Sequence, residues 1–181
     1  MSYRNTATTY GSVAKVFHWT IFILVLAMIV VGFGYEAVPK EIGYPLIGLH
    51  KSTGLVILGI MALRILWTLS NPKPGLPAGT PHWEIVVEKL VHWSLYGLLL
   101  ALPISGWVMS TAADKAPSLY GLVTLPLPGV PIDKPLSKLA NHWHGYMGWA
   151  ISILIILHVL AALKHHFMDK DNILKRMMPG D

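Results

Sequence analysis

The chain has 181 residues, of which 54% are hydrophobic and only 13% are charged. Few soluble domains of this length carry so little charge, so the composition favours a membrane protein. The length is that of a single domain. The lack of cysteine excludes disulfides, thiolate metal sites, iron–sulfur clusters and covalently attached c-type haem, and the net charge of +5 indicates basic loops at a membrane surface and no nucleic-acid partner.

Four long apolar runs predict membrane-spanning helices, because each is close to the roughly 20 residues that cross a hydrocarbon core. In chain order, the predicted spans are 13–34, 47–69, 89–111 and 143–167. The connecting segments are rich in Pro and Gly, and we expect loops or an interfacial segment at 35–46, 70–88 and 112–142. The predicted fold is therefore an all-α membrane protein, a four-transmembrane-helix bundle, with residues 1–181 as a single transmembrane domain.

The distribution of basic residues predicts the direction in which the chain crosses the membrane. Nine basic residues lie on the side of the two termini: Arg4, Lys15, Arg64, Lys73, Lys89, Lys164, Lys170, Lys175 and Arg176. Five lie on the opposite side: Lys40, Lys51, Lys115, Lys134 and Lys138. Because cytoplasmic loops carry the excess of Lys and Arg, both termini are expected in the cytoplasm.

Histidines inside the spans are the most informative residues. His144 and His158 are fourteen residues apart in the last span, about 3.9 helical turns, so both lie on one helix face about 21 Å apart. Antiparallel threading places His50 at the outer depth of His144 and His18 at the inner depth of His158. A single such histidine is a functional candidate or a hydrogen-bonded residue that joins helices, but two pairs at two depths favour function.

Two stacked histidine pairs in a four-helix bundle suit haem, since neutral imidazoles can ligate its iron from both sides. Zinc or copper would need three or four ligands at one point. A proton-coupled metal transporter would be expected to carry a carboxylate inside its spans, and the predicted spans contain none. An alternative function outside redox chemistry is a helical transporter whose histidines are structural or bind a metal ion. A porphyrin needs backbone clearance, which glycines near the outer histidines would provide: Gly48, Gly54, Gly145 and Gly148.

Three further residues are candidates for the cofactor sites. Arg64 follows His50 by fourteen residues, so it lies on the same face at the depth of the inner haem, where it either meets the propionates or snorkels at a helix end. Lys51, beside His50, could pair with the outer propionates. His92 starts the third span at the inner depth; we expect His18 to be the ligand and His92 to serve as a proton donor at a quinone site, although His92 could replace His18. The remaining histidines are expected at solvated positions: His82, His142, His165 and His166.

The chain resembles the bacterial cytochrome b-561 family over about residues 10 to 179. The resemblance is carried by VFHW, by LHKSTG with the later Arg64, by LPISGWVM, by WHG followed by LH, and by HHFMDKDNILKRMMP at the tail. Members are inner-membrane proteins of four helices with two b haems. By position, the haem ligands of the family correspond to His18, His50, His144 and His158.

The resemblance also implies a function. One member of the family is characterised as a superoxide:ubiquinone oxidoreductase. The resemblance therefore implies two haem b groups as cofactors, superoxide or another small periplasmic molecule as electron donor, and ubiquinone from the quinone pool as acceptor. It also implies contact with membrane lipid. The related cytochrome b subunits of hydrogenases and formate dehydrogenases suggest the alternative of an electron-transfer subunit that links the quinol pool to a redox partner.

Overall fold

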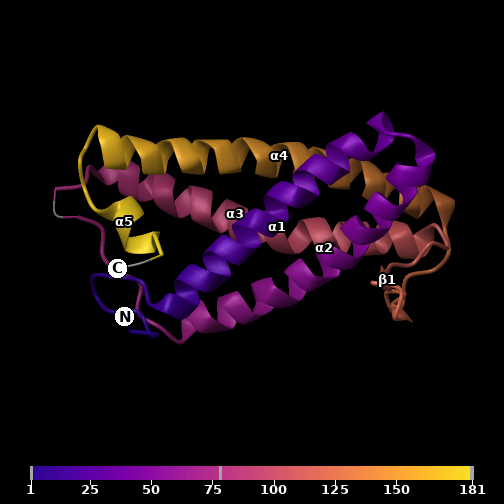
Figure 1. The fold of residues 1–181 in the computed structure, drawn as a ribbon, viewed down its shortest axis with the longest axis horizontal. Helices are drawn as coiled ribbons and strands as arrows, with labels where there is room; N and C mark the ends of the chain where they lie inside the picture. The colour runs from indigo at the N-terminus through magenta and orange to yellow at the C-terminus, as the bar shows by residue number, and fades with distance from the viewer. Residues whose placement is uncertain (1, 78, 180–181) are drawn as a thin grey trace.

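A computed structural model of the chain describes residues 2–77 and 79–179. In this part of the chain, four helices are long and apolar enough to cross a membrane, which confirms the predicted four-helix membrane bundle (Figure 1). They are α1 (Ser12–Gly34), α2 (Lys40–Leu69), α3 (His82–Ala112) and α4 (Lys134–Phe167). The shorter elements are the 3-10 helix η1 (Tyr35–Ala37), the strands β1 (Ser118–Leu119) and β2 (Val123–Thr124), and the helix α5 (Ile173–Met177).

Three of the helices begin earlier than their apolar runs, so the predicted loops were too long. α2 begins at Lys40, α3 at His82 and α4 at Lys134. Hydropathy detects only the lipid-facing part of a helix, whereas the helix itself continues to its cap. At α4 this cap is Asp133, whose carboxylate accepts a hydrogen bond of 2.6 Å from the backbone N–H of Leu136.

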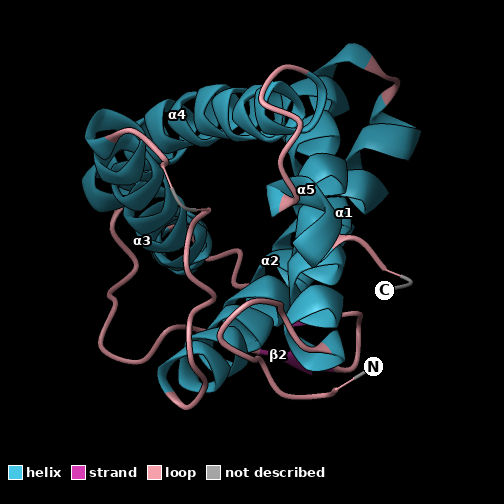
Figure 2. Cartoon of the chain, turned by 90° about the vertical axis from the view of Figure 1, so that its left-hand side faces the viewer, coloured by secondary structure: helices cyan, strands magenta, loops and turns pink. Residues whose placement is uncertain are grey.

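The helices run up and down, and both chain termini lie at one end of the bundle together with α5 (Figure 1). We call this the terminal end, and the opposite end, with η1 and the β1–β2 hairpin, the hairpin end. Close backbone contacts join α1 to α2, α2 to α3, and α3 to α4, whereas few or none join α4 to α1 or to α2. Viewed from the terminal end, α3 and α4 lie side by side, as do α1 and α2 (Figure 2).

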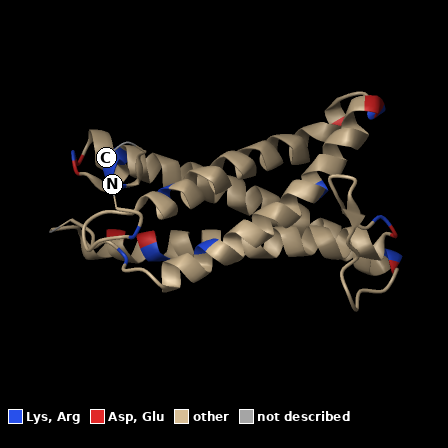
Figure 3. Cartoon of the chain, turned by 60° about the horizontal axis from the view of Figure 1, so that its bottom comes forward, with Lys and Arg blue, Asp and Glu red and all other residues tan. Residues whose placement is uncertain are grey.

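The surface of the bundle is suited to lipid. Charged residues gather toward the two ends of the bundle and few lie in the middle (Figure 3), as the cost of charge in hydrocarbon requires. Many large apolar side chains point outward, with Val30 72% exposed. A small apolar cluster fills the centre: Ile21, Val25, Ile57, Met61 and Ile151. The chain is thus built as a multi-pass membrane protein.

The segment between α3 and α4, expected to be irregular or interfacial, forms the short antiparallel hairpin of β1 and β2, in which Ser118 pairs with Thr124. It docks on α2 near Ser52 and Thr53. The Ser52 hydroxyl donates to the Ser118 carbonyl at 2.6 Å, and Thr53 lies 3.2 Å from the Tyr120 hydroxyl. Polar residues after His50 therefore hold the hairpin against α2.

Candidate functional site

One histidine pair lies at the hairpin end. His50 of α2 and His144 of α4 have ring centroids 6.1 Å apart, with the ring planes at 70°. Nδ1 of His144 lies 3.1 Å from the Leu102 carbonyl oxygen and 2.9 Å from the Ser105 hydroxyl. Since a carbonyl only accepts, Nδ1 carries the proton and Nε2 keeps a free lone pair, as an imidazole ligand needs. Nδ1 of His50 is buried and has no hydrogen-bond partner among the described residues.

Both rings of this pair lie against a glycine of a neighbouring helix. A Cβ added at Gly32 of α1 would lie 3.2 Å from Cε1 of His50, and one added at Gly106 of α3 would lie 3.2 Å from Cε1 of His144. Sequence reasoning missed these two glycines, although both lie in apolar spans at the depth of the outer histidines. The glycines it named do not crowd either ring; an added Cβ would have no described atom within 4 Å at Gly48, Gly54 and Gly145, and would meet Phe33 at 3.9 Å at Gly148.

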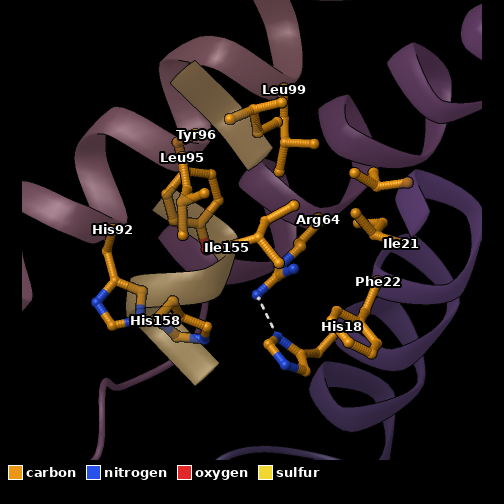
Figure 4. A pocket seen from close by; sticks show the side chains of 12 residues that line it. His18, Ile21, Phe22, Arg64, His92, Leu95, Tyr96, Leu99, Ile155 and His158 are labelled. Atoms are coloured by element: carbon orange, nitrogen blue, oxygen red, sulfur yellow. Dashed lines mark hydrogen bonds between the residues drawn. The ribbon is translucent and has the colours of Figure 1, made fainter. Parts of the chain in front are cut away.

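The second histidine group, drawn in Figure 4, lies toward the terminal end, where α1 begins and α4 ends. His18 of α1 and His158 of α4 have ring centroids 6.2 Å apart, with the ring planes at 55°. His92 of α3 is closer to His158, with a centroid separation of 5.2 Å. The structure therefore brings together all three histidines that the depth argument assigned to this level, around one cavity lined by α1, α2, α3 and α4.

Distance distinguishes the candidate pairs. With metal–nitrogen bonds of about 2.0 Å and about 1.1 Å from each ring nitrogen to its ring centre, two imidazoles on opposite sides of one iron have centroids about 6.2 Å apart. The pairs His18/His158 at 6.2 Å and His50/His144 at 6.1 Å match this separation, whereas His92/His158 at 5.2 Å is about 1 Å too short. Both matching pairs join α4 to a helix with which it has few close backbone contacts. The residues fit a flat group at each level.

His92 has a different environment. Its Nδ1 lies 2.8 Å from a carboxylate oxygen of Glu88 and 2.8 Å from the Glu88 carbonyl oxygen, one turn earlier in α3. Glu88 also accepts a 2.9 Å hydrogen bond from Lys73. Sequence reasoning missed Glu88, although the i,i+4 spacing to His92 could have revealed it. This pair of groups can hold a proton beside the terminal-end cavity.

Arg64 lies in the terminal-end cavity, where its spacing from His50 predicted it. Its Nη2 is 3.2 Å from Nδ1 of His18, the contact dashed in Figure 4, and its guanidinium carbon is 5.5 Å from the ring centre of Tyr96. In this arrangement Arg64 donates to Nδ1, so the His18 proton is on Nε2. Ligation through Nε2 requires the proton on Nδ1, and Arg64 then needs another acceptor, for which a haem propionate is suited.

Lys51 lies beside His50, but its side chain turns to the hairpin segment. Its ammonium donates to the Lys115 carbonyl oxygen at 3.0 Å, because this segment folds back over the start of α2. In the structure Lys51 therefore helps to hold the hairpin, a contact that sequence reasoning did not predict.

The remaining histidines divide into two groups. His82 and His142 are exposed, as expected. The expectation was wrong for His165 and His166, which are partly buried, because α4 ends against the start of α3 and the turn after α4. His165 Nδ1 lies 2.7 Å from Asp171, and Lys164 bridges Glu84 at 2.7 Å and Asp169 at 2.8 Å. Ion pairs thus fasten the end of α4.

Comparisons with known proteins agree with this architecture. Residues 9–180 match the family described as Prokaryotic cytochrome b561. The chain is 35% identical to "Cytochrome b561 homolog 2" of Escherichia coli (strain K12) over 181 residues, 98% of this chain and 95% of the relative. It is 30% identical to "Probable superoxide oxidase CybB" of Yersinia pestis over 166 residues, 90% and 91% of the two chains. It is 31% identical to "Cytochrome b561 homolog 1" of Escherichia coli (strain K12) over 134 residues, 72% and 73% of the two chains.

Proposed function

This chain belongs to the prokaryotic cytochrome b561 family of haem b electron-transfer proteins of bacterial membranes, and from that premise we propose that it is a superoxide oxidase that reduces ubiquinone. Two superoxide ions each lose one electron and become O₂, while one ubiquinone gains two electrons and two protons and becomes ubiquinol. When bound, two b haems supply the one-electron steps between these substrates.

The observation that carries the two-haem proposal is the centroid separation of 6.1 Å for His50/His144 and 6.2 Å for His18/His158. These pairs would hold one haem at the hairpin end and one haem at the terminal end, each through its two imidazoles. Hydrogen bonding of His144 to the Leu102 carbonyl supports the assignment, because it holds the ring in the ligating tautomer.

Other side chains take supporting roles at the terminal end. Arg64 would bind a propionate and so balance a negative charge that is otherwise costly within the bundle. His92 and Glu88, which share a hydrogen bond of 2.8 Å, would hold protons for the reduced quinone. Both residues lie in the part of α3 that begins at the terminal end (Figure 1).

Superoxide as the donor is supported by the similarity to the Yersinia pestis relative, whose name gives that activity as probable. The hairpin end is the proposed entry side, facing the periplasm with both termini in the cytoplasm, in accord with the excess of Lys and Arg on the terminal side. Lys51 and Lys115, which are joined there by a hydrogen bond, place positive charge near His50, where a small anion would approach.

Right-side-out membrane vesicles test this proposal. Superoxide generated outside should reduce the b haems within the mixing time and should form ubiquinol, and added superoxide dismutase should abolish both signals. A matched control is His50→Ala, which should lose the response at the hairpin end. If external superoxide leaves the haems oxidised while ubiquinol reduces them, the chain is instead an electron-transfer subunit for a redox partner; if the purified chain has no b-haem absorption, it is not a redox protein.

A further inference from the structure

A second cavity, distinct from the one between His18 and His158, opens at the terminal end. It has a volume of about 440 Å³, and since one water needs about 10–15 Å³ on this measure, a phosphate group with part of its hydration shell has room there. Its walls are α1, the segment before α1, and α5 with the residue before it. The lining contains three cations, several neutral donors and no carboxylate: Ser2, Thr9, Tyr10, Ser12, Lys15, Asn172, Lys175 and Arg176.

Among the described residues that line this cavity, the charges are all positive. Lys15 is only 7% exposed, and its ammonium belongs to the cavity lining, in which no described acidic group lies. Arg176 donates through Nη1 to the Gly75 carbonyl, but its buried Nε has no described partner. Like charges gathered in one cavity repel each other and raise the local concentration of anions, so this lining favours an anionic ligand.

The surroundings add further attraction for an anion. Ser12 begins α1, and the first turn of that helix contains no acidic residue, so the positive end of the helix dipole is not neutralised. Burial raises the pKa of Tyr10 above its ordinary value, which keeps the phenol protonated and able to donate. Charge, dipole and donors therefore act in the same direction.

The position of the cavity selects the source of the anion. Val16, the residue after Lys15, is 64% exposed, and Met178, directly after α5, is 41% exposed. An apolar surface thus begins at the rim of a basic cavity, at the end where the membrane helices leave the hydrocarbon. We propose that this cavity binds the phosphate of an anionic phospholipid headgroup, with Lys15 and Arg176 as its principal ligands and the acyl chains lying along α1. A free phosphate compound would satisfy the same donors but not the apolar rim.

Native mass spectrometry of the full haem-loaded chain in a neutral detergent tests this proposal. Phosphatidylglycerol should bind at one saturable site, at least about tenfold tighter than zwitterionic phosphatidylcholine. Lys15→Gln and Arg176→Gln should each weaken phosphatidylglycerol binding by about tenfold. The matched control is Lys89→Gln, which removes an exposed cation at the same end outside the cavity and should leave binding unchanged.

Each arm of the experiment has a result that overturns the proposal. Equal binding of the two lipids by the wild-type chain, which needs no variant to fold, excludes an anion-selective lipid site. Competition by inorganic phosphate or glycerol phosphate at the concentration of the lipid assigns the cavity to a soluble ligand. If Lys15→Gln lowers the haem content by pyridine haemochrome assay but leaves lipid binding intact, the charge serves the haem and not a lipid.

Discussion

Replacing Gly106 with alanine should disturb the hairpin-end haem through the ring of His144. The added Cβ would lie 3.2 Å from Cε1 of His144, and ordinary contacts begin at 3.4 Å, so the ring has to retreat by at least about 0.2 Å. That distance equals the tolerance of about 0.2 Å within which metal–ligand bonds are held. The ring cannot retreat freely, because its Nδ1 is bound to the Leu102 carbonyl and to Ser105.

Gly32 provides the matched comparison. Its added Cβ would approach Cε1 of His50 at the same 3.2 Å, but Nδ1 of His50 has no hydrogen-bond partner among the described residues. His50 can therefore turn without losing a hydrogen bond at Nδ1, whereas His144 cannot. Loss of a hydrogen bond that orients a metal ligand costs about 10- to 100-fold in affinity. We expect a loss of this size for Gly106→Ala and a smaller loss for Gly32→Ala.

The assay combines a pyridine haemochrome measurement with low-temperature electron paramagnetic resonance, which reports the orientation of each pair of axial rings. Gly106→Ala should lose or shift one of two low-spin signals and leave the other unchanged. Gly54→Ala is the control, since its Cβ would have no described atom within 4 Å. The reasoning is refuted if Gly106→Ala keeps both signals and both haems, or if Gly32→Ala has the larger effect.

Three further predictions concern the other candidate residues. His18→Ala should lose about one of two haems by pyridine haemochrome assay, whereas His92→Ala should keep both and slow quinone reduction; the opposite pattern would make His92 the ligand. Arg64→Leu removes a cation beside the haem proposed at the terminal end. Redox titration should show the reduction potential of this haem lowered by about 60 mV or more, which is a tenfold change in its one-electron equilibrium constant, and the potential of the other haem unchanged. Wild-type potentials for both haems with normal turnover would contradict this. Lys51→Glu should slow haem reduction by external superoxide at low ionic strength. The difference in rate from the wild type should shrink near 1 M salt, where the Debye length is about 3 Å. A rate difference that does not depend on salt would point to damage to the hairpin instead.

Much of the candidate site was accessible from spacing alone, because a helix in a membrane has little freedom. The spans must be about 20 apolar residues long and alternate in direction, so a position in the sequence becomes a depth. This reasoning placed His50 with His144, placed His18 and Arg64 with His158, and left His92 as a second candidate at the same level. The structure has the same groupings. Depth alone could not separate His18 from His92, since both lie at one level. Only the packed structure gives their ring separations from His158, 6.2 Å and 5.2 Å, on which the proposed assignment of His18 rests.

Contacts between neighbouring helices could not be predicted from the sequence, because depth does not determine which helices are neighbours or how their faces are turned. The apposition of Gly106 to His144 depends on the packing of α3 against α4, and the bond from Lys51 to the Lys115 carbonyl depends on the return of the hairpin over α2. The basic cavity around Lys15 and Arg176 joins residues from the two ends of the chain. Hydrophobicity and helical geometry are local properties and determined the spans, their depths and the histidine levels, whereas the orientation of each ring and the grouping of distant cations arise only when the helices pack.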